Sequence, residues 1–367
     1  MVPPRFDAAE LVRFLVAGDA AEFLSPVTEG AGVLVLDLKT TPPEAARLAE
    51  AELVAQLPIL PCVTIALGAD PDDRVGRALA QICDVQVDSE ASLAVLLRGF
   101  ADTPLAALAF VQLLRGAPRS SVYGGLVAES FVYSTLQSGA EFDAWRARWK
   151  SERKAKRTFR ESLRARRGAA NQESQNGNAC RLSRDRGELE LMLTRPTKHN
   201  AFSAAMRDGL AEGLALALAD PSIEEVVLRG EGESFCSGGD LDEFGSFPDP
   251  ARAHAIRTTR SPALLLSRLG SRARCEVHGA CIGAGVELPA FTARVIAFED
   301  AYFQLPEIAL GLVPGAGGTV SLPARIGRQR TAWLGLSGQR IDAQTALDWG
   351  LVDELRLGQH IGSARDA

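Results

Sequence analysis

Two glutamates lie beside glycine-rich turns in the carboxyl-terminal half of the chain. Glu287 stands in the apolar stretch "CIGAGVEL", and Glu307 lies in "FQLPEIALG". A buried carboxylate is costly unless it is paired, protonated or used, and two neighbouring carboxylates push their pKa values apart. One can then be protonated while the other is ionised. This arrangement suits the addition or removal of H and OH across a polarised double bond.

Two further turns offer backbone N–H groups to a ligand. They read "FCSGGDL" (235–241) and "GLVPGAGGT" (311–319). Small residues let a ligand approach the main chain, and N–H groups at the start of a helix carry partial positive charge. Two such donors from separate turns can stabilise a developing oxyanion, and each is worth about 3 to 4 kcal/mol.

Other chemistries fit these motifs poorly. Neither "GAGVEL" nor "GAGGTV" completes the dinucleotide fingerprint, and no phosphate-loop lysine follows either turn. No nucleophile elbow surrounds Ser237. The histidines are isolated from one another and from any paired cysteine, so we expect no metal site, and we expect His278 to pack beside a turn.

The composition predicts a globular protein of two domains. The chain has 367 residues, of which 46% are hydrophobic and 23% charged, and its net charge of -6 argues against nucleic-acid binding. No basic segment followed by an apolar one suggests a secretory signal, and no apolar run of about 18 residues suggests a membrane span. The six scattered cysteines resemble small buried hydrophobic residues of a reducing compartment. We expect a cytoplasmic enzyme.

Strands and helices alternate in both halves, which predicts an α/β fold. In the second half, "LELMLTR" (189–195) and "EEVVLRG" (224–230) read as strands, with a helix capped by Ser203 between them. In the first half, "GVLVLDL" (32–38) and "CVTIALG" (62–68) are strand-like, and "PEAARLAEAELVAQL" and "DTPLAALAFVQLLRG" are helix-like. We therefore predict an α/β module at 1–150 and a catalytic domain at 179–367.

The segment 151–178 is predicted to be a basic arm followed by a flexible linker. From 150 to 167 the chain reads "KSERKAKRTFRESLRARR", and a Gly- and Asn-rich stretch follows. Such a run could contact nucleic acid or the phosphates of a ligand. A solvated helix face is the favoured interpretation.

Five motifs in the second half together resemble the enoyl-CoA hydratase/isomerase (crotonase) superfamily. They are "FCSGGDL", "VHGACIGAGVEL", "AYFQLPEIALGLVPGAGGT", "LPARIG" and "ALDWGLVDEL", and they stand in family order between residues 189 and 355. The resemblance implies a crotonase-like spiral of repeated ββα units. It also implies an acyl-CoA substrate and no cofactor besides the coenzyme A of that substrate.

The resemblance also implies roles for individual residues. Glu287 would activate water, and Glu307 would exchange the proton at the α-carbon of the thioester. The backbone N–H groups of Ser237 and Ala284 would form the oxyanion hole. Further substrate-binding residues would come from the same turns, with Asp240 also able to act as a turn cap: Cys236, Gly238, Asp240, Leu241, Gly283, Gly285, Pro306 and Gly315.

The first half resembles parts of the same family more weakly. Family chains continue past "GLVDEL" into a helical tail, and here "LVAESFVYSTLQSGAEFDAWRARW" (126–149) resembles that tail instead. We hypothesise that residues 1–150 are a degenerate crotonase-like copy without an active site. The hypothesis aligns Gly76 with Gly285, Glu90 with Glu299, Ala78 with Glu287, and Arg98 with Glu307.

Both glutamates together favour an enoyl-CoA hydratase, a hydro-lyase. Another enolate reaction (isomerase, C–C hydrolase or lyase, or oxygenase) and a non-catalytic partner subunit remain alternatives, since a fold does not fix a function. We expect an acyl-CoA thioester as ligand, no nucleic acid and no membrane. A homo-oligomer such as a trimer is expected, and a partner enzyme of the same pathway is a further option.

Overall fold

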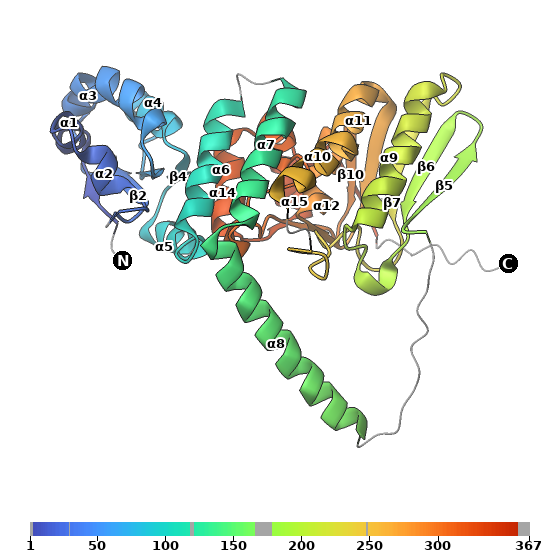
Figure 1. The fold of residues 1–367 in the computed structure, drawn as a ribbon. Coiled ribbons are helices and arrows are strands. Elements are labelled where there is room, and N and C mark those ends of the chain that lie inside the picture. Colours follow the sequence, from blue (N-terminus) through green and yellow to red (C-terminus); the bar gives the residue numbers. More distant parts are fainter. Residues whose placement is uncertain (1–2, 29, 118–120, 166–177, 247–248, 359–367) are drawn as a thin grey trace.

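The two halves of the chain are each built on a mainly parallel β-sheet in this computed structural model (Figure 1). The structure describes residues 3–28, 30–117, 121–165, 178–246 and 249–358. The amino-terminal sheet consists of β1 (Arg5–Phe6), β2 (Val33–Asp37), β3 (Val63–Leu67) and β4 (Val85–Val87). These strands run parallel in the order β1-β2-β3-β4.

Helices cover both faces of the amino-terminal sheet. They are α1 (Ala8–Val16), α2 (Ala20–Leu24), α3 (Pro43–Gln56), α4 (Arg74–Ile82), α5 (Glu90–Gly99) and α6 (Pro104–Gly116), with a 3-10 turn at Leu57–Ile59. Val35 and Ile65 pack on the side of α5 and α6, whereas Leu34 and Leu36 pack on the side of α1 and α3. Because both faces are covered, every residue of β2 and β3 is buried.

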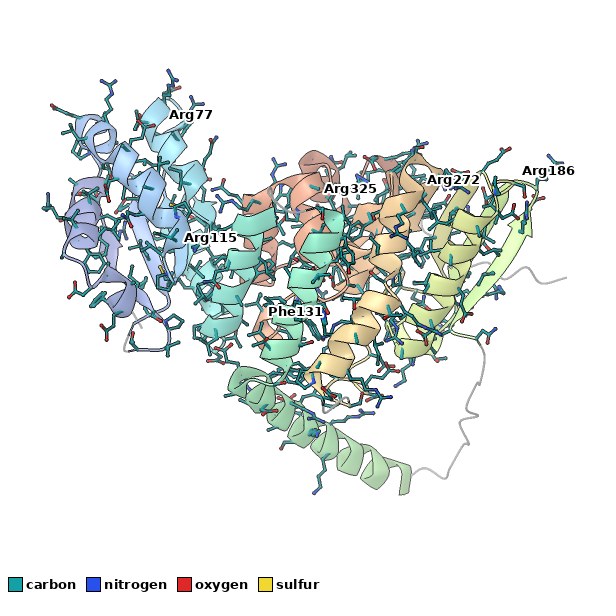
Figure 2. The ribbon with its side chains drawn as sticks, turned by 45° about the horizontal axis from the view of Figure 1, so that its top comes forward. Arg77, Arg115, Phe131, Arg186, Arg272 and Arg325 are labelled. Carbon is teal, nitrogen blue, oxygen red and sulfur yellow. The ribbon has the colours of Figure 1, made fainter. Side chains whose placement is uncertain are left out.

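A buried carboxylate joins the two halves. Asp84 accepts hydrogen bonds from Arg115 of the first half at 2.6 Å and from Arg328 of the second half at 3.2 Å. Figure 2 shows Arg115 in the amino-terminal part. Val313 and Leu336 of the second half belong to the same apolar cluster as β2 and β3. The halves therefore share part of their core.

The carboxyl-terminal half contains two sheets. The larger consists of β5 (Cys180–Asp185), β6 (Glu188–Leu193), β7 (Glu225–Gly230), β8 (Ala273–Val277), β10 (Arg294–Phe298) and β13 (Glu354–Arg356). Its strand order is β13-β10-β8-β7-β6-β5, and only β5 is antiparallel to its neighbour. The smaller sheet has the order β12-β11-β9 and consists of β9 (Ala280–Ile282), β11 (Tyr302–Gln304) and β12 (Ile341–Asp342).

The helices of this half follow pairs of strands. They are α9 (Ala204–Ala219), α10 (Pro250–Thr259), α11 (Pro262–Leu269), α12 (Ala284–Glu287), α13 (Gly318–Ile326), α14 (Arg328–Ser337) and α15 (Ala343–Trp349), with 3-10 turns at Pro196–Lys198, Gly270–Arg272, Pro289–Phe291 and Ile308–Leu310. The pair β8 and β9 leads into α12, and the pair β10 and β11 leads towards α13. The predicted spiral of ββα units is thereby confirmed.

Local predictions agree with these elements. Ser203 caps α9, because its side chain accepts a hydrogen bond from the N–H of Met206. Met206, Leu210 and Leu214 are buried on one face of that helix, as their spacing of four predicts. All six cysteines are buried and free.

A long segment of the first half crosses to the second. Helix α7 (Val122–Gln137) packs against α10, α11 and α13, and α8 (Ala140–Ala165) continues from it and projects outward (Figure 1). The helical part of the predicted basic arm is confirmed, and the linker that follows lies outside the described residues. Within the described ranges no single helix is long and apolar enough to cross a membrane. Helices α5 and α6, which meet at a sharp bend, would together be long and apolar enough.

The hypothesis of a degenerate copy stays a prediction. The parallel order β2-β3-β4 corresponds to β7-β8-β10, and Gly76 lies in the helix before β4 as Gly285 lies in the helix before β10. In the described part of the first half, however, the strands form one sheet, and nothing there pairs like the second sheet of the other half.

Candidate active site

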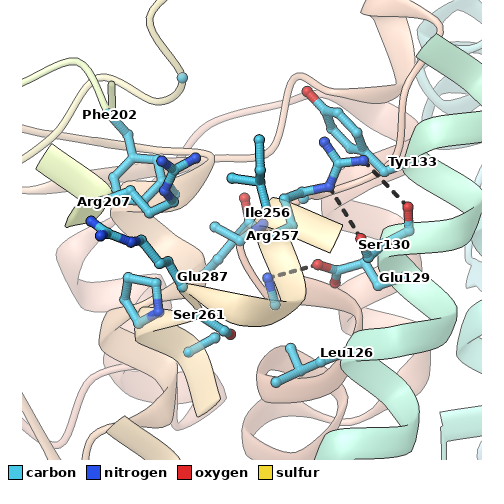
Figure 3. A pocket seen from close by; sticks show the side chains of 18 of the residues that line it. Leu126, Glu129, Ser130, Tyr133, Phe202, Arg207, Ile256, Arg257, Ser261 and Glu287 are labelled. Carbon is cyan, nitrogen blue, oxygen red and sulfur yellow. Dashed lines mark hydrogen bonds between the residues drawn. The ribbon is translucent and has the colours of Figure 1, made fainter. Parts of the chain in front are cut away.

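A cavity of about 230 Å³ lies where α7 and α10 meet the starts of α9, α12 and α13. Five residues predicted from the sequence to carry chemistry or bind substrate line it together: Asp240, Ala284, Glu287, Glu307 and Gly315. The first half of the chain contributes Glu129 and Tyr133 from α7 (Figure 3). The cavity therefore belongs to both halves.

Glu287 is buried and held by the glycine-rich turn before α13. Its Oε2 accepts hydrogen bonds from the N–H of Ala316 at 2.7 Å and of Gly318 at 2.8 Å. Burial raises the pKa of Glu287 to about 7, although these N–H donors oppose the rise. The N–H of Gly315 also lowers this pKa, and both of the short hydrogen bonds to the carboxylate go to Oε2 rather than Oε1. Glu287 thus has one anchored oxygen and one oxygen available to a ligand.

Glu307 faces the same cavity without a partner for one oxygen. Its Oε2 is buried and makes no hydrogen bond with the described residues. Burial raises the pKa of Glu307 well above its usual value, and the negative charge of Glu287 raises it further. Its Oε1 lies only 2.3 Å from the position that a Cβ would take at Gly283, which has a φ of +52°. Glycine is therefore needed there for two reasons, the backbone angle and the space that Glu307 occupies.

A third carboxylate, Glu129, holds the same glycine-rich turn from the opposite side. Its Oε1 accepts a hydrogen bond from the N–H of Gly317 at 2.7 Å, and its Oε2 accepts from the N–H and the hydroxyl of Thr319 at 2.9 and 2.7 Å. Burial, followed by the charge of Glu287, raises the pKa of Glu129 to about 8. The N–H groups of residues 316 to 319 thus point alternately to Glu287 and Glu129, and the ionisation of the two acids is coupled.

The backbone donors differ from the prediction at one of two positions. The N–H of Ser237 donates to the carbonyl of His199 at 3.0 Å, and Ser237 does not line the cavity. The assignment of Ser237 is therefore wrong, because its N–H is used to fix the loop. Gly239 does line the cavity, as does Ala284, and neither N–H donates to another described residue. These two N–H groups can bind an oxyanion together.

The remaining predicted substrate-binding residues divide into two groups. Asp240 and Gly315 line the cavity, and the carboxylate of Asp240 also pairs with Arg195 at 2.7 Å. The others lie behind the cavity wall, so direct contact with substrate is not supported for Cys236, Gly238, Leu241, Gly283, Gly285 and Pro306.

Those residues shape the site through backbone packing. A Cβ at Gly285 would lie 2.4 Å from the carbonyl oxygen of Cys236, so glycine allows α12 to approach the loop that contains Cys236. His278 bonds through Nε2 to the carbonyl of Gly232 at 2.9 Å, in keeping with its predicted place beside a turn.

Residues of α7 and α10 were not predicted as part of the site. Glu129, Tyr133 and Arg257 all line the cavity. The resemblance of residues 126–149 to a family tail was the one signal that pointed to α7. Nothing in the spacing of the sequence connects Glu129 with Gly317, because the two are 188 positions apart.

Comparisons with known proteins agree with this geometry. Residues 184–359 match the family model described as enoyl-CoA hydratase/isomerase. The chain is 37% identical over 176 residues to 2,3-dehydroadipyl-CoA hydratase of Escherichia coli (strain K12), a match that covers 47% of this chain and 68% of that protein. It is 34% identical over 172 residues to 1,2-epoxyphenylacetyl-CoA isomerase of the same organism, covering 46% and 66%.

A solved structure shows the same extent of similarity. The enoyl-CoA hydratase from Thermoplasma volcanium GSS1 is 31% identical, with a TM-score of 0.45, and the match covers 49% of this chain and 72% of that one. The same family is indicated by the identity to the curated relatives, by the matching family model and by the paired glutamates. Through its carboxyl-terminal half, the chain belongs to the enoyl-CoA hydratase/isomerase family.

Proposed function

We propose that this protein adds water across the double bond of an α,β-unsaturated acyl-CoA thioester. The observation that carries the proposal is the meeting of two buried carboxylates, Glu287 and Glu307, with the N–H groups of Ala284 and Gly239 in one cavity. An isomerase needs to move only a proton, whereas a hydratase must also activate water. Two acids with separate environments fit the second task.

The thioester carbonyl would accept hydrogen bonds from Ala284 and Gly239. Both donors stabilise the negative charge that this oxygen gains when the β-carbon is attacked. The donors are fixed before the reaction, because Gly239 lies in the loop anchored by the bond from Ser237 to His199 and Ala284 begins α12. Little reorganisation is then needed when the charge develops.

Glu287 would accept a proton from water while the oxygen of that water bonds to the β-carbon. Its Oε2 stays on the glycine-rich turn, and its Oε1 takes the proton. Glu307 would donate its proton to the α-carbon, which completes the addition of OH and H. The ionised form of Glu287 raises the pKa of Glu307, so the base is ionised and the acid keeps its proton. A return of the proton from Glu287 to Glu307 restores the starting state.

The test is a hydration assay with a panel of trans-2-enoyl-CoA thioesters of different chain length. Wild type is compared with Glu287→Gln and Glu307→Gln, and we expect each variant to lose about 100- to 10,000-fold in kcat while it still binds the thioester. Glu44→Gln is the control, because this residue of α3 is exposed and does not line the cavity.

The outcomes separate the remaining alternatives. If wild type binds acyl-CoA but hydrates no member of the panel, another enolate reaction such as isomerisation replaces the proposal. If no CoA ester binds, the crotonase fold serves as a non-catalytic subunit.

A further inference from the structure

One cationic side chain in the cavity forms no ion pair with any acid of the described residues. Arg257 of α10 donates from Nε to the hydroxyl of Ser130 at 3.2 Å and from Nη2 to the carbonyl of Ser130 at 3.4 Å. Its Nη2 also donates to the hydroxyl of Ser134, and its guanidinium lies 4.7 Å above the centre of the Tyr133 ring (Figure 3). All of these partners are neutral and lie on α7.

The other arginines that line the cavity are neutralised. Arg207 pairs with Asp208 at 2.7 Å, and Arg260 pairs with Asp208 at 3.2 Å and with Glu212 at 3.9 Å. Within the described ranges, Arg257 forms no ion pair, and the neighbouring acid Glu129 gives both of its oxygens to the glycine-rich turn. Burial lowers the pKa of the Arg257 guanidinium. The nearby charge of Glu129 opposes this lowering without forming an ion pair. The structure therefore keeps a half-buried guanidinium in the cavity that no carboxylate of the described residues contacts directly.

One edge of the guanidinium is available to an anion. Of its three nitrogens, Nε and Nη2 are used by α7, whereas Nη1 donates to none of the described residues. Because guanidinium groups match carboxylates in shape and charge, the free edge is suited to an oxygen of a carboxylate.

We propose that the acyl group of the substrate ends in a carboxylate and that Arg257 recognises it. The substrate class is a CoA monothioester of an unsaturated dicarboxylic acid. This inference rests on the proposed function for the reaction, and on the geometry of Arg257 for the substrate. A phosphate of coenzyme A carries similar oxygens, but it is present in every acyl-CoA and would give no preference between acyl groups.

The experiment compares matched pairs of trans-2-enoyl-CoA thioesters. In each pair the acyl chains have equal length, and one ends in a carboxylate where the other ends in a methyl group. The measured quantity is the ratio of kcat/KM within a pair. We expect wild type to favour the carboxylated member at least tenfold and Arg257→Met to lower the ratio about 100-fold, because it removes one partner of a shielded charge pair. Arg257→Lys should restore part of the ratio.

Two controls separate recognition from folding. Arg252→Met changes an exposed arginine of the same helix and should leave the ratio unchanged. Thermal melting of each variant reports whether α7 still packs on α10. If Arg257→Met lowers kcat/KM equally for both members of a pair, the guanidinium serves helix packing or the phosphates of coenzyme A, and the proposal is overturned. An unchanged ratio overturns it as well.

Binding of saturated thioesters tests the inference apart from the reaction. Isothermal titration calorimetry with saturated acyl-CoA pairs, one carboxylated and one neutral, needs no turnover. If wild type hydrates neither unsaturated compound but binds the carboxylated saturated one at least tenfold more tightly, and Arg257→Met loses this preference, the proposed reaction fails and the substrate class stands. If hydration is robust but both members bind equally, the reaction stands and the substrate class is refuted.

Discussion

Replacing Glu129 tests whether the amino-terminal half completes the active site. In Glu129→Ala, the buried N–H groups of Gly317 and Thr319 lose their acceptors. An unsatisfied buried donor costs about 1 to 3 kcal/mol, so the two together should lower the free energy of unfolding by about 2 to 6 kcal/mol. Glu129→Gln keeps the shape of the side chain but turns one acceptor into a donor, and about half of that loss is expected.

The Glu129 variants should lose more activity than their lower free energy of unfolding accounts for. The turn that Glu129 holds also donates to Glu287 through Ala316 and Gly318, so its movement displaces the carboxylate that activates water. A displacement of about 1 Å can cost about 100-fold in rate. The charge of Glu129 and that of Glu287 disfavour each other. Because the pKa of Glu129 is about 8 and that of Glu287 about 7, Glu129 is still protonated when Glu287 ionises, so in Glu129→Gln the acid limb of the pH–rate profile should stay near pH 7.

A matched control exists in the same region of the chain. Glu141 also accepts two backbone N–H bonds, from Leu105 at 2.8 Å and Ala106 at 3.0 Å, at the start of α6 and outside the cavity. Glu141→Ala should cost about 0.5 to 2 kcal/mol, as for a lost helix cap, and leave kcat unchanged. Chemical denaturation gives the free energies, and hydration of enoyl-CoA from pH 5 to 9 gives the profiles. If Glu129→Ala resembles Glu141→Ala in its free energy of unfolding and in its activity, α7 only covers the cavity without supporting catalysis, and the reasoning fails.

Three further predictions concern the carboxylates and their turn. The wild-type kcat/KM should rise as pH increases through about 7, because Glu287 must lose its proton, and fall again at higher pH when Glu307 loses its own; a flat profile would contradict these roles. Gly283→Ala should lose activity because its Cβ would meet Glu307 Oε1, whereas Gly270→Ala, at φ +57° with nothing within 4 Å, has similar backbone strain without the collision and should stay active in the same assay. The pKa of Glu287 is raised from 4.5 to about 7 by burial, so the folded state keeps its proton in a window where the unfolded chain has lost it. The free energy of unfolding should therefore fall by about 3 kcal/mol as the pH rises from 4.5 to about 7. Urea denaturation at pH 5 and 8 measures this fall, which should be smaller in Glu287→Gln than in wild type.

The parts of the site that were predictable are those encoded over short distances in the sequence. Glu287 follows its glycine turn within a few residues, and the cap of α9 at Ser203 follows from side-chain chemistry and a spacing of four. The error at Ser237 has a different origin. Which N–H of "FCSGGDL" faces the cavity depends on the bonds from Ser237 to His199 and from Phe202 to Gly238, and these long-range contacts leave no local pattern.

The contribution of α7 could not be read from spacing at all. Its glutamate meets a turn on another part of the chain only because apolar packing brings α7 against α13. The resemblance of residues 126–149 to a family tail indicated a surface for packing, but it assigned no role to Glu129.

The glycine-rich turn explains why the two halves depend on each other. Its four successive N–H groups, from Ala316 to Thr319, are shared by two carboxylates on opposite sides, one from each half. If α7 were removed, two of these donors would lose their acceptors, and the turn would no longer be fixed against Glu287. Arg257 would lose its bonds to Ser130 and Ser134 at the same time. The amino-terminal half thus supports both the base that activates water and the cation proposed to select the acyl group, whatever the origin of its own sheet.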